Sequence, residues 1–162
     1  MNTLHRPAQI SEEFKQELER DLDHLRTDVR PMIAERLRSA REGGDITDNA
    51  AFEQAKEDLA RLMGRISEIE QILREATVIH HEGTRKPRQV AVGTVVSVHR
   101  DDGRECTYKI VDSMEASPKD GKVSDMSPIG QALVGHKRGD RVKVQAPAGI
   151  MKYTIKDIQF IQ

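Results

Sequence analysis

Residues 51–76, with the sequence AFEQAKEDLARLMGRISEIEQILREA, decide the fold of the first half of the chain. Apolar side chains recur there at alternating intervals of three and four residues, at Phe52, Ala55, Leu59, Leu62, Ile66, Ile69, Leu73 and Ala76. This spacing is that of a coiled-coil seam over about four heptads. A single helix would leave such a seam in water, so the pattern predicts a second helix that covers it.

A second apolar stripe with slightly looser spacing lies upstream, at Phe14, Leu18, Leu22, Leu25, Val29, Ile33, Leu37 and Ala40. Between the stripes, Gly43-Gly44 can adopt the positive φ values that end a helix. Asp45 or Thr47 can then cap the next helix, with Asp48 in its first turn. The sequence therefore predicts an antiparallel helical hairpin over residues 1–79, with arms about 45 Å long.

Pro31 interrupts the first stripe. Because proline lacks a backbone N–H and crowds the preceding turn, it is expected either to kink the first arm or to open a new helical segment.

The second half of the chain is predicted to form strands at 90–98, 107–111, 141–145 and 152–161. Two turns and one short helix are expected between them, at 101–103, 147–149 and 129–134. We predict a small, twisted antiparallel sheet over residues 89–162, joined to the hairpin by a linker at residues 80–88. The expected fold class is α+β.

The composition narrows the classes of function. The chain has 26 basic and 27 acidic residues; residues 1–79 hold 12 and 17 of them, and the rest of the chain holds 14 and 10. This balance excludes a nucleic-acid binder that relies on bulk charge. Only five aromatic residues and no tryptophan are present, which excludes a base-stacking surface.

Localisation and cysteine chemistry are equally constrained. No apolar run approaches the roughly 18 residues needed to cross a bilayer, and Met1–Gln9 has no signal-peptide core, so a cytoplasmic protein is expected. The single Cys106 excludes an internal disulfide and is expected to be a small buried hydrophobe. His80 and His81 are adjacent, which is poor geometry for holding zinc.

Asp45 and Asp48 are the most informative acids. Their spacing of three places them on one side of the first helical turn. Two close carboxylates repel each other, so such a pair either caps the helix or holds a cation. Spacing alone favours capping. Two carboxylates are too few for a dedicated magnesium site, although they can supply half of a site that a partner completes.

Motifs around these acids, and others along the chain, occur in a characteristic order. The hairpin contains RPMIA at 30–34, REGGDITDNA at 41–50, Ala55-Lys56-Glu57 and Gly64-Arg65-Ile66. The second half contains GTVV at 93–96, SPIGQALVG at 127–135 and Pro147-Ala148-Gly149. In this order, over residues 10–160, the chain resembles the bacterial Gre transcript cleavage factors.

The resemblance implies a coiled-coil hairpin followed by an FKBP-like domain that docks at the rim of the secondary channel of RNA polymerase. The hairpin would enter the channel and bring Asp45 and Asp48 to the polymerase active site. There the two acids would help to hold a Mg²⁺ ion shared with the polymerase during cleavage of backtracked RNA. The protein would then be a cofactor of the polymerase and a monomer, with no metal bound by itself and no enzyme activity of its own.

Further residues are assigned by the same resemblance. Arg41 and Lys56 match basic positions that face the RNA 3′ end. Ser127, Pro128 and Ile129 match the loop that lies toward the polymerase rim. The FKBP-like fold alone does not predict prolyl isomerase activity.

The hairpin tip departs from the family pattern at three places. Asp48 stands where Glu is usual, Ala51-Phe52 where Glu-Tyr is common, and Gly44 where a His or similar residue usually precedes Asp45. Two alternatives to cleavage therefore stay open. One is a Gre homologue that occupies the channel and inhibits or modulates transcription without efficient cleavage. The other is a coiled-coil interaction protein with no catalytic role.

Overall fold

The computed structural model describes residues 7–43, 46–80 and 86–161, and of residues 46–49 only the backbone. The chain forms two compact units. One is Lys15–Glu75, and the other combines Met1–Phe14 with Ala76–Gln162. The unit boundaries thus differ from the predicted hairpin range of 1–79, since the described residues at both ends of that range group with the strands.

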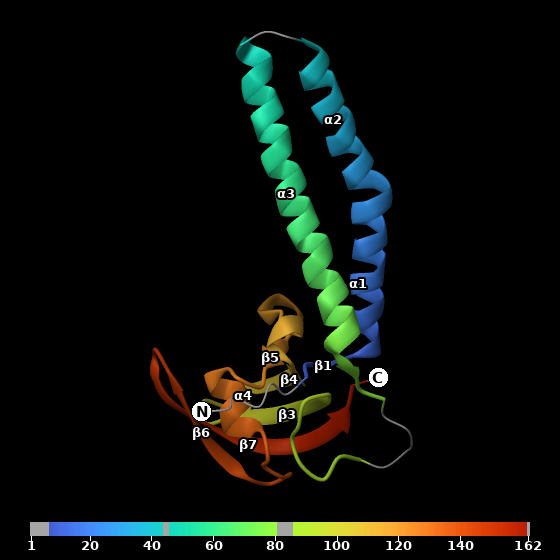
Figure 1. The fold of residues 1–162 in the computed structure, drawn as a ribbon. Coiled ribbons are helices and arrows are strands. Elements are labelled where there is room, and N and C mark those ends of the chain that lie inside the picture. Colours follow the sequence, from blue (N-terminus) through green and yellow to red (C-terminus); the bar gives the residue numbers. More distant parts are fainter. Residues whose placement is uncertain (1–6, 44–45, 81–85, 162) are drawn as a thin grey trace, which may run out of the picture. The chain divides into compact units, whose positions relative to one another are not determined.

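The helical unit is built from two arms that run side by side (Figure 1). The first arm comprises α1 (Glu12–His24), a π-helical turn η1 (Leu25–Val29) and α2 (Arg30–Gly43), and the second is α3 (Ile46–Glu75). The seam consists of the predicted apolar residues: Ile33, Leu62 and Ile66 are buried, and Leu22, Leu25, Val29, Leu37 and Leu59 pack against them. The predicted antiparallel hairpin is therefore confirmed.

The π-helical turn ends at Val29, two residues before Pro31. Its wider hydrogen-bond pattern is shown by Arg30, whose N–H donates to the carbonyl of Leu25, five residues earlier. A proline ring crowds the carbonyl four residues before it, and an extra residue in the preceding turn relieves that crowding. Of the two effects expected of Pro31, the structure shows a new helical segment, which begins at Arg30.

The second unit contains a five-stranded sheet in the order β5-β4-β3-β7-β6. Its strands are β3 (Thr94–Arg100), β4 (Glu105–Val111), β5 (Lys122–Ser124), β6 (Arg141–Ala146) and β7 (Gly149–Phe160). The expected turns join β3 to β4 and β6 to β7, and the predicted short helix is α4 (Pro128–Leu133). One pairing corrects the prediction of an antiparallel sheet: β5 runs parallel to β4.

The core of this unit lies between the sheet and α4. Buried apolar side chains from four strands meet Leu133 of α4 there: Val96, Val98, Ile110, Val142, Val144, Tyr153, Ile155 and Ile158. The pairing of β3 with β7 shifts between Ser97 and Val98, and such a bulge bends a sheet. The strand expected at 90–98 begins only at Thr94, because Gly93 has a φ of 89° and turns the chain before it.

A short parallel pair completes the second unit. β1 (Gln9–Ile10) pairs with β2 (Thr77–Val78), and the side chain of Ile10 is fully buried. Two short 3₁₀ helices, η2 (Ser113–Glu115) and η3 (Pro118–Asp120), lie between β4 and β5. The β1–β2 pair explains why the residues before and after the helical unit belong with the strands. Much of the predicted linker, residues 81–85, lies outside the described residues.

Candidate functional site

The two acids expected at the hairpin tip fall largely outside what the structure describes. Asp45 lies outside the described residues, and Asp48 is described only as backbone in the first turn of α3. The helical placement of Asp48 agrees with the prediction. Within the part of the chain that the structure describes, no group of three or more His, Cys, Asp or Glu side chains could hold a metal ion.

Next to the tip, the structure brings Arg41 and Lys56 to the same aromatic ring. The guanidinium carbon of Arg41, in the last turn of α2, lies 6.0 Å from the centre of the Phe52 ring. The ammonium group of Lys56, one turn along α3 from Phe52, lies 5.4 Å from that centre. Lys56 also forms an ion pair with Glu53, at 3.2 Å. Sequence reasoning named both cations separately and did not connect them through Phe52.

The expected docking residues lie around the start of α4. The hydroxyl of Ser127 accepts a hydrogen bond from the N–H of Gly130 (3.1 Å) and donates one to the carbonyl of Ser124 (2.7 Å), so this side chain caps the helix. Pro128 is exposed, whereas Ile129 is half-buried and packs against the core of the sheet. Of the three predicted contacts, Pro128 is therefore the most accessible.

The backbone before α4 leaves no room for a side chain at Gly130. A Cβ added there would lie 2.0 Å from the carbonyl oxygen of Ser124 and 2.9 Å from the Cα of Asp125. Met114 of η2 and Met126, between β5 and α4, have exposed side chains, and a hydrogen bond joins the nearby hydroxyls of Ser113 and Ser124 (2.8 Å).

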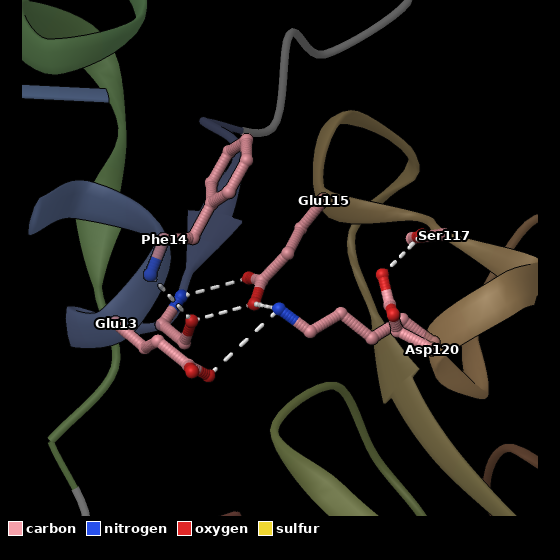
Figure 2. A network of polar contacts seen from close by, with 7 residues as sticks. Glu13, Phe14, Glu115, Ser117 and Asp120 are labelled. Carbon is pink, nitrogen blue, oxygen red and sulfur yellow. Dashed lines mark hydrogen bonds and ion pairs between the residues drawn. The ribbon is translucent and has the colours of Figure 1, made fainter. Parts of the chain in front are cut away.

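Figure 2 shows a polar network at the start of α1, centred on Glu115. This carboxylate is only 5% exposed. It accepts hydrogen bonds from the hydroxyl and the backbone N–H of Ser11, at 2.5 and 3.0 Å. Lys122 forms ion pairs with Glu115 at 3.3 Å and with Glu13 at 3.8 Å. The network holds the N-terminal segment against η2 and β5.

The same network fixes the beginning of α1. The hydroxyl of Ser11 accepts a hydrogen bond from the N–H of Phe14, three residues on, which is the bond of a helix N-cap. Ser11 therefore both caps the helix and donates to Glu115. Sequence reasoning missed this site, because Ser11 and Glu115 are 104 residues apart and neither belongs to a recognisable motif.

Tyr108 and Cys106 lie on β4 and pack against the sheet core. Cys106 is half-buried rather than fully buried as expected. The three-residue β5 pairs only with residues 109–111 of β4, so it does not extend as far as Cys106. Burial, followed by hydrogen bonding with Cys106 and Tyr153, raises the pKa of the Tyr108 phenol. The rings of Tyr108 and Tyr153 meet edge to face, 6.4 Å apart.

The described helices include none that is both long enough and apolar enough to cross a membrane. The fold defines a class of protein that combines a helical hairpin with a small sheet domain. Residues 8–78 match the family model described as "Transcription elongation factor, N-terminal", and residues 85–160 match that described as "Transcription elongation factor, GreA/GreB, C-term". The chain belongs to the GreA/GreB family of transcription elongation factors.

Individual relatives match over almost their whole length. Transcription elongation factor GreA of Roseiflexus sp. (strain RS-1) is 44% identical over 156 residues, which cover 95% of this chain and 98% of the relative. The protein of the same name from Thermoanaerobacter pseudethanolicus is 40% identical over 157 residues, or 96% and 99% of the two chains. The crystal structure of GreA factor homolog 1 from Thermus thermophilus matches 95% of this chain and 99% of that one, with 26% identity and a TM-score of 0.44.

Proposed function

We propose that this protein enters the secondary channel of RNA polymerase and stimulates the polymerase's own cleavage of backtracked RNA, which rescues arrested complexes. The observation that carries the proposal is the match of both halves of the chain, in order, to proteins named transcription elongation factor GreA. The hairpin adds a physical argument. The 30 residues of α3 extend about 45 Å, so the tip of the hairpin stands far from its base, as entry into a channel requires.

Asp45 and Asp48 are the residues that would act at the polymerase active site. Their carboxylate oxygens are hard donors of the kind that Mg²⁺ prefers, and Mg²⁺ commonly takes one or two carboxylates together with other ligands. This donor set fits a metal shared with the polymerase better than one held by this chain alone. When bound, the ion would stabilise charge on the attacking and leaving oxygens of the RNA phosphodiester. The part of this chain is to deliver the two carboxylates.

The other assigned residues would bind and orient. Arg41 and Lys56 would contact phosphates of the extruded RNA 3′ segment. Ser127, Pro128 and Ile129 would contact the polymerase rim, with Pro128 as the exposed member. In this mechanism the protein is a cofactor rather than an autonomous enzyme, and one copy serves one polymerase.

A cleavage assay on a backtracked elongation complex tests the proposal. Wild-type protein with Mg²⁺ should shorten the RNA from its 3′ end. The double variant Asp45→Ala/Asp48→Ala should lose at least a hundredfold in rate while still binding the polymerase. The matched control Glu17→Ala/Asp21→Ala removes two exposed acids from α1 and should cleave normally.

The assay also separates the alternatives. If saturating wild-type protein yields no shortened RNA, the cleavage assignment is wrong. Inhibition of transcription that survives the double substitution would indicate a regulator that acts by occupying the channel. Absence of any complex with the polymerase would leave a coiled-coil interaction protein without a role in transcription.

A further inference from the structure

Phe52 contacts a cation from each arm of the hairpin. Arg41 comes from α2 and Lys56 from α3, and each cationic group lies within about 6 Å of the ring centre. Because both distances are measured to the centre of the Phe52 ring, the two cationic groups are no more than about 11 Å apart. A short stretch of sugar–phosphate backbone can bridge such a separation. The ring thus brings together two cations that are 15 positions apart in the sequence.

We propose that Phe52 is a positioning residue that holds Arg41 and Lys56 together as one two-cation site for the phosphate backbone of single-stranded RNA. This inference rests on the proposed function and adds to it how the cations are arranged. The face of an aromatic ring carries partial negative charge and attracts a cation within about 6 Å. The ring neutralises neither cation, so both keep N–H donors for phosphate oxygens.

The advantage of this arrangement is preorganisation. Free Arg and Lys side chains populate many rotamers, and ordering them when RNA binds costs free energy. Contact with a half-buried ring restricts both side chains before RNA arrives. Because one cation comes from each arm, the contact with Arg41 also ties the end of α2 to α3.

One neighbouring acid competes for this site. The Glu53 carboxylate forms an ion pair with Lys56 on the exposed surface of α3. Exposed ion pairs contribute little to stability, so a phosphate can replace the carboxylate at small cost. The contact of Lys56 with Phe52 does not use the N–H donors of the ammonium group, so a phosphate that replaces Glu53 does not have to displace the ring.

Three substitutions separate a cation–π role from simple packing. Phe52→Leu keeps an apolar side chain in the seam but removes the ring, whereas Phe52→Tyr keeps the ring. Phe14→Leu is a matched control, because it removes another half-buried ring far from the tip in sequence. All three are compared in the full-length protein, first by NMR and then with a backtracked elongation complex.

In the isolated protein, ring-current shifts should move the Arg41 Hδ and Lys56 Hε resonances upfield. These shifts should persist in Phe52→Tyr and vanish in Phe52→Leu. In the elongation complex, Phe52→Leu should slow cleavage at saturating factor about two- to fivefold, with unchanged affinity for the polymerase. Phe52→Tyr and Phe14→Leu should cleave at the wild-type rate. Phe52→Leu should add little to the defect of Arg41→Ala, because both changes disrupt the same contact.

The outcomes distinguish this inference from the proposed function. If wild type cleaves and Phe52→Leu cleaves equally well, the positioning role is wrong and the proposed function stands. If wild type binds the complex without cleaving, the proposed function fails. The yield of crosslinks between the hairpin and a photoreactive RNA 3′ end then decides the inference. A yield that falls in Phe52→Leu alone supports it, and an unchanged yield or no crosslink in wild type overturns it.

Discussion

The Glu115 carboxylate is almost completely removed from water, a costly position for a charged group unless its partners compensate. Ser11 donates two hydrogen bonds to it, and Lys122, itself mostly covered, supplies the opposite charge. The Glu115 side chain on η2 thus serves as the acceptor for Ser11 in the N-terminal segment and for Lys122 on β5. Residues of this kind make large contributions to stability because their removal leaves several buried polar groups unpaired.

We expect Glu115→Ala to lower the free energy of unfolding by about 1–3 kcal/mol, because the Ser11 N–H and the Lys122 ammonium group lose their acceptor. Urea denaturation followed by circular dichroism measures this change. Glu105→Ala is the control, since that carboxylate on β4 is exposed and its removal should cost less than about 0.5 kcal/mol. Equal effects of the two substitutions would show that the Glu115 network contributes nothing.

The Tyr108 phenol leads to a prediction about alkaline pH. Burial raises its pKa in the folded protein, while an unfolded chain ionises tyrosine at a pKa of about 10. The stability that this difference provides is fully present below pH 10 and is lost as the pH rises above it, because only the unfolded state then releases the proton.

The free energy of unfolding should therefore fall between pH 9 and pH 11 more steeply in wild type than in Tyr108→Phe. Urea titrations at several pH values measure the two slopes. Parallel slopes would mean that Tyr108 ionises equally readily in the folded and unfolded protein.

At the scale of elements, the helices and most strands follow from local patterns. The heptad stripes of residues 14–40 and 52–76 set the hairpin, since residues of both stripes pack together in the seam. Alternation and turn residues located β6 and β7, which pair directly across Pro147-Ala148. These features depend only on neighbours in the sequence.

The elements that were missed depend on distant partners. β1 and β2 have two residues each and pair across 68 positions, so no periodicity can reveal them. The parallel pairing of the three-residue β5 has the same cause. In the candidate site, the spacing of Asp45 and Asp48 singled out the acidic pair, whereas its role and the choice of Arg41 and Lys56 came from motif resemblance. That Phe52 contacts both cations could be recognised only from the structure, because Arg41 and Phe52 lie on different arms of the hairpin.

Gly64 offers a prediction for α3 as an element. It lies in the middle of this helix with an exposed position, and a Cβ added there would meet nothing within 4 Å. Gly64→Ala should therefore stabilise the helical unit by about 0.5–1 kcal/mol, because alanine loses less backbone freedom when the helix forms. A rise in the urea midpoint of the helical signal measures this gain. A lower midpoint would mean that α3 requires a glycine here for another reason.

At the scale of the whole molecule, each of the two units has a core of its own. Among the described residues, the core cluster of the sheet unit contains ten buried side chains, whereas the seam cluster of Lys15–Glu75 contains three. A larger buried core predicts slower local opening, so amides of β3, β4 and β7 should exchange with solvent more slowly than those of α2 and α3. Native-state hydrogen exchange followed by mass spectrometry measures both sets in one experiment.

Two variants make this prediction specific to each unit. Gly64→Ala should slow exchange in α2 and α3 and leave the sheet unchanged, because the substitution acts only within the helical unit. Glu115→Ala should speed exchange in the N-terminal segment and around η2 and β5, where its partners lie, and leave the central part of α3 unchanged. If either variant shifts every amide by the same factor, the molecule unfolds as one cooperative unit and the two cores are not energetically separate.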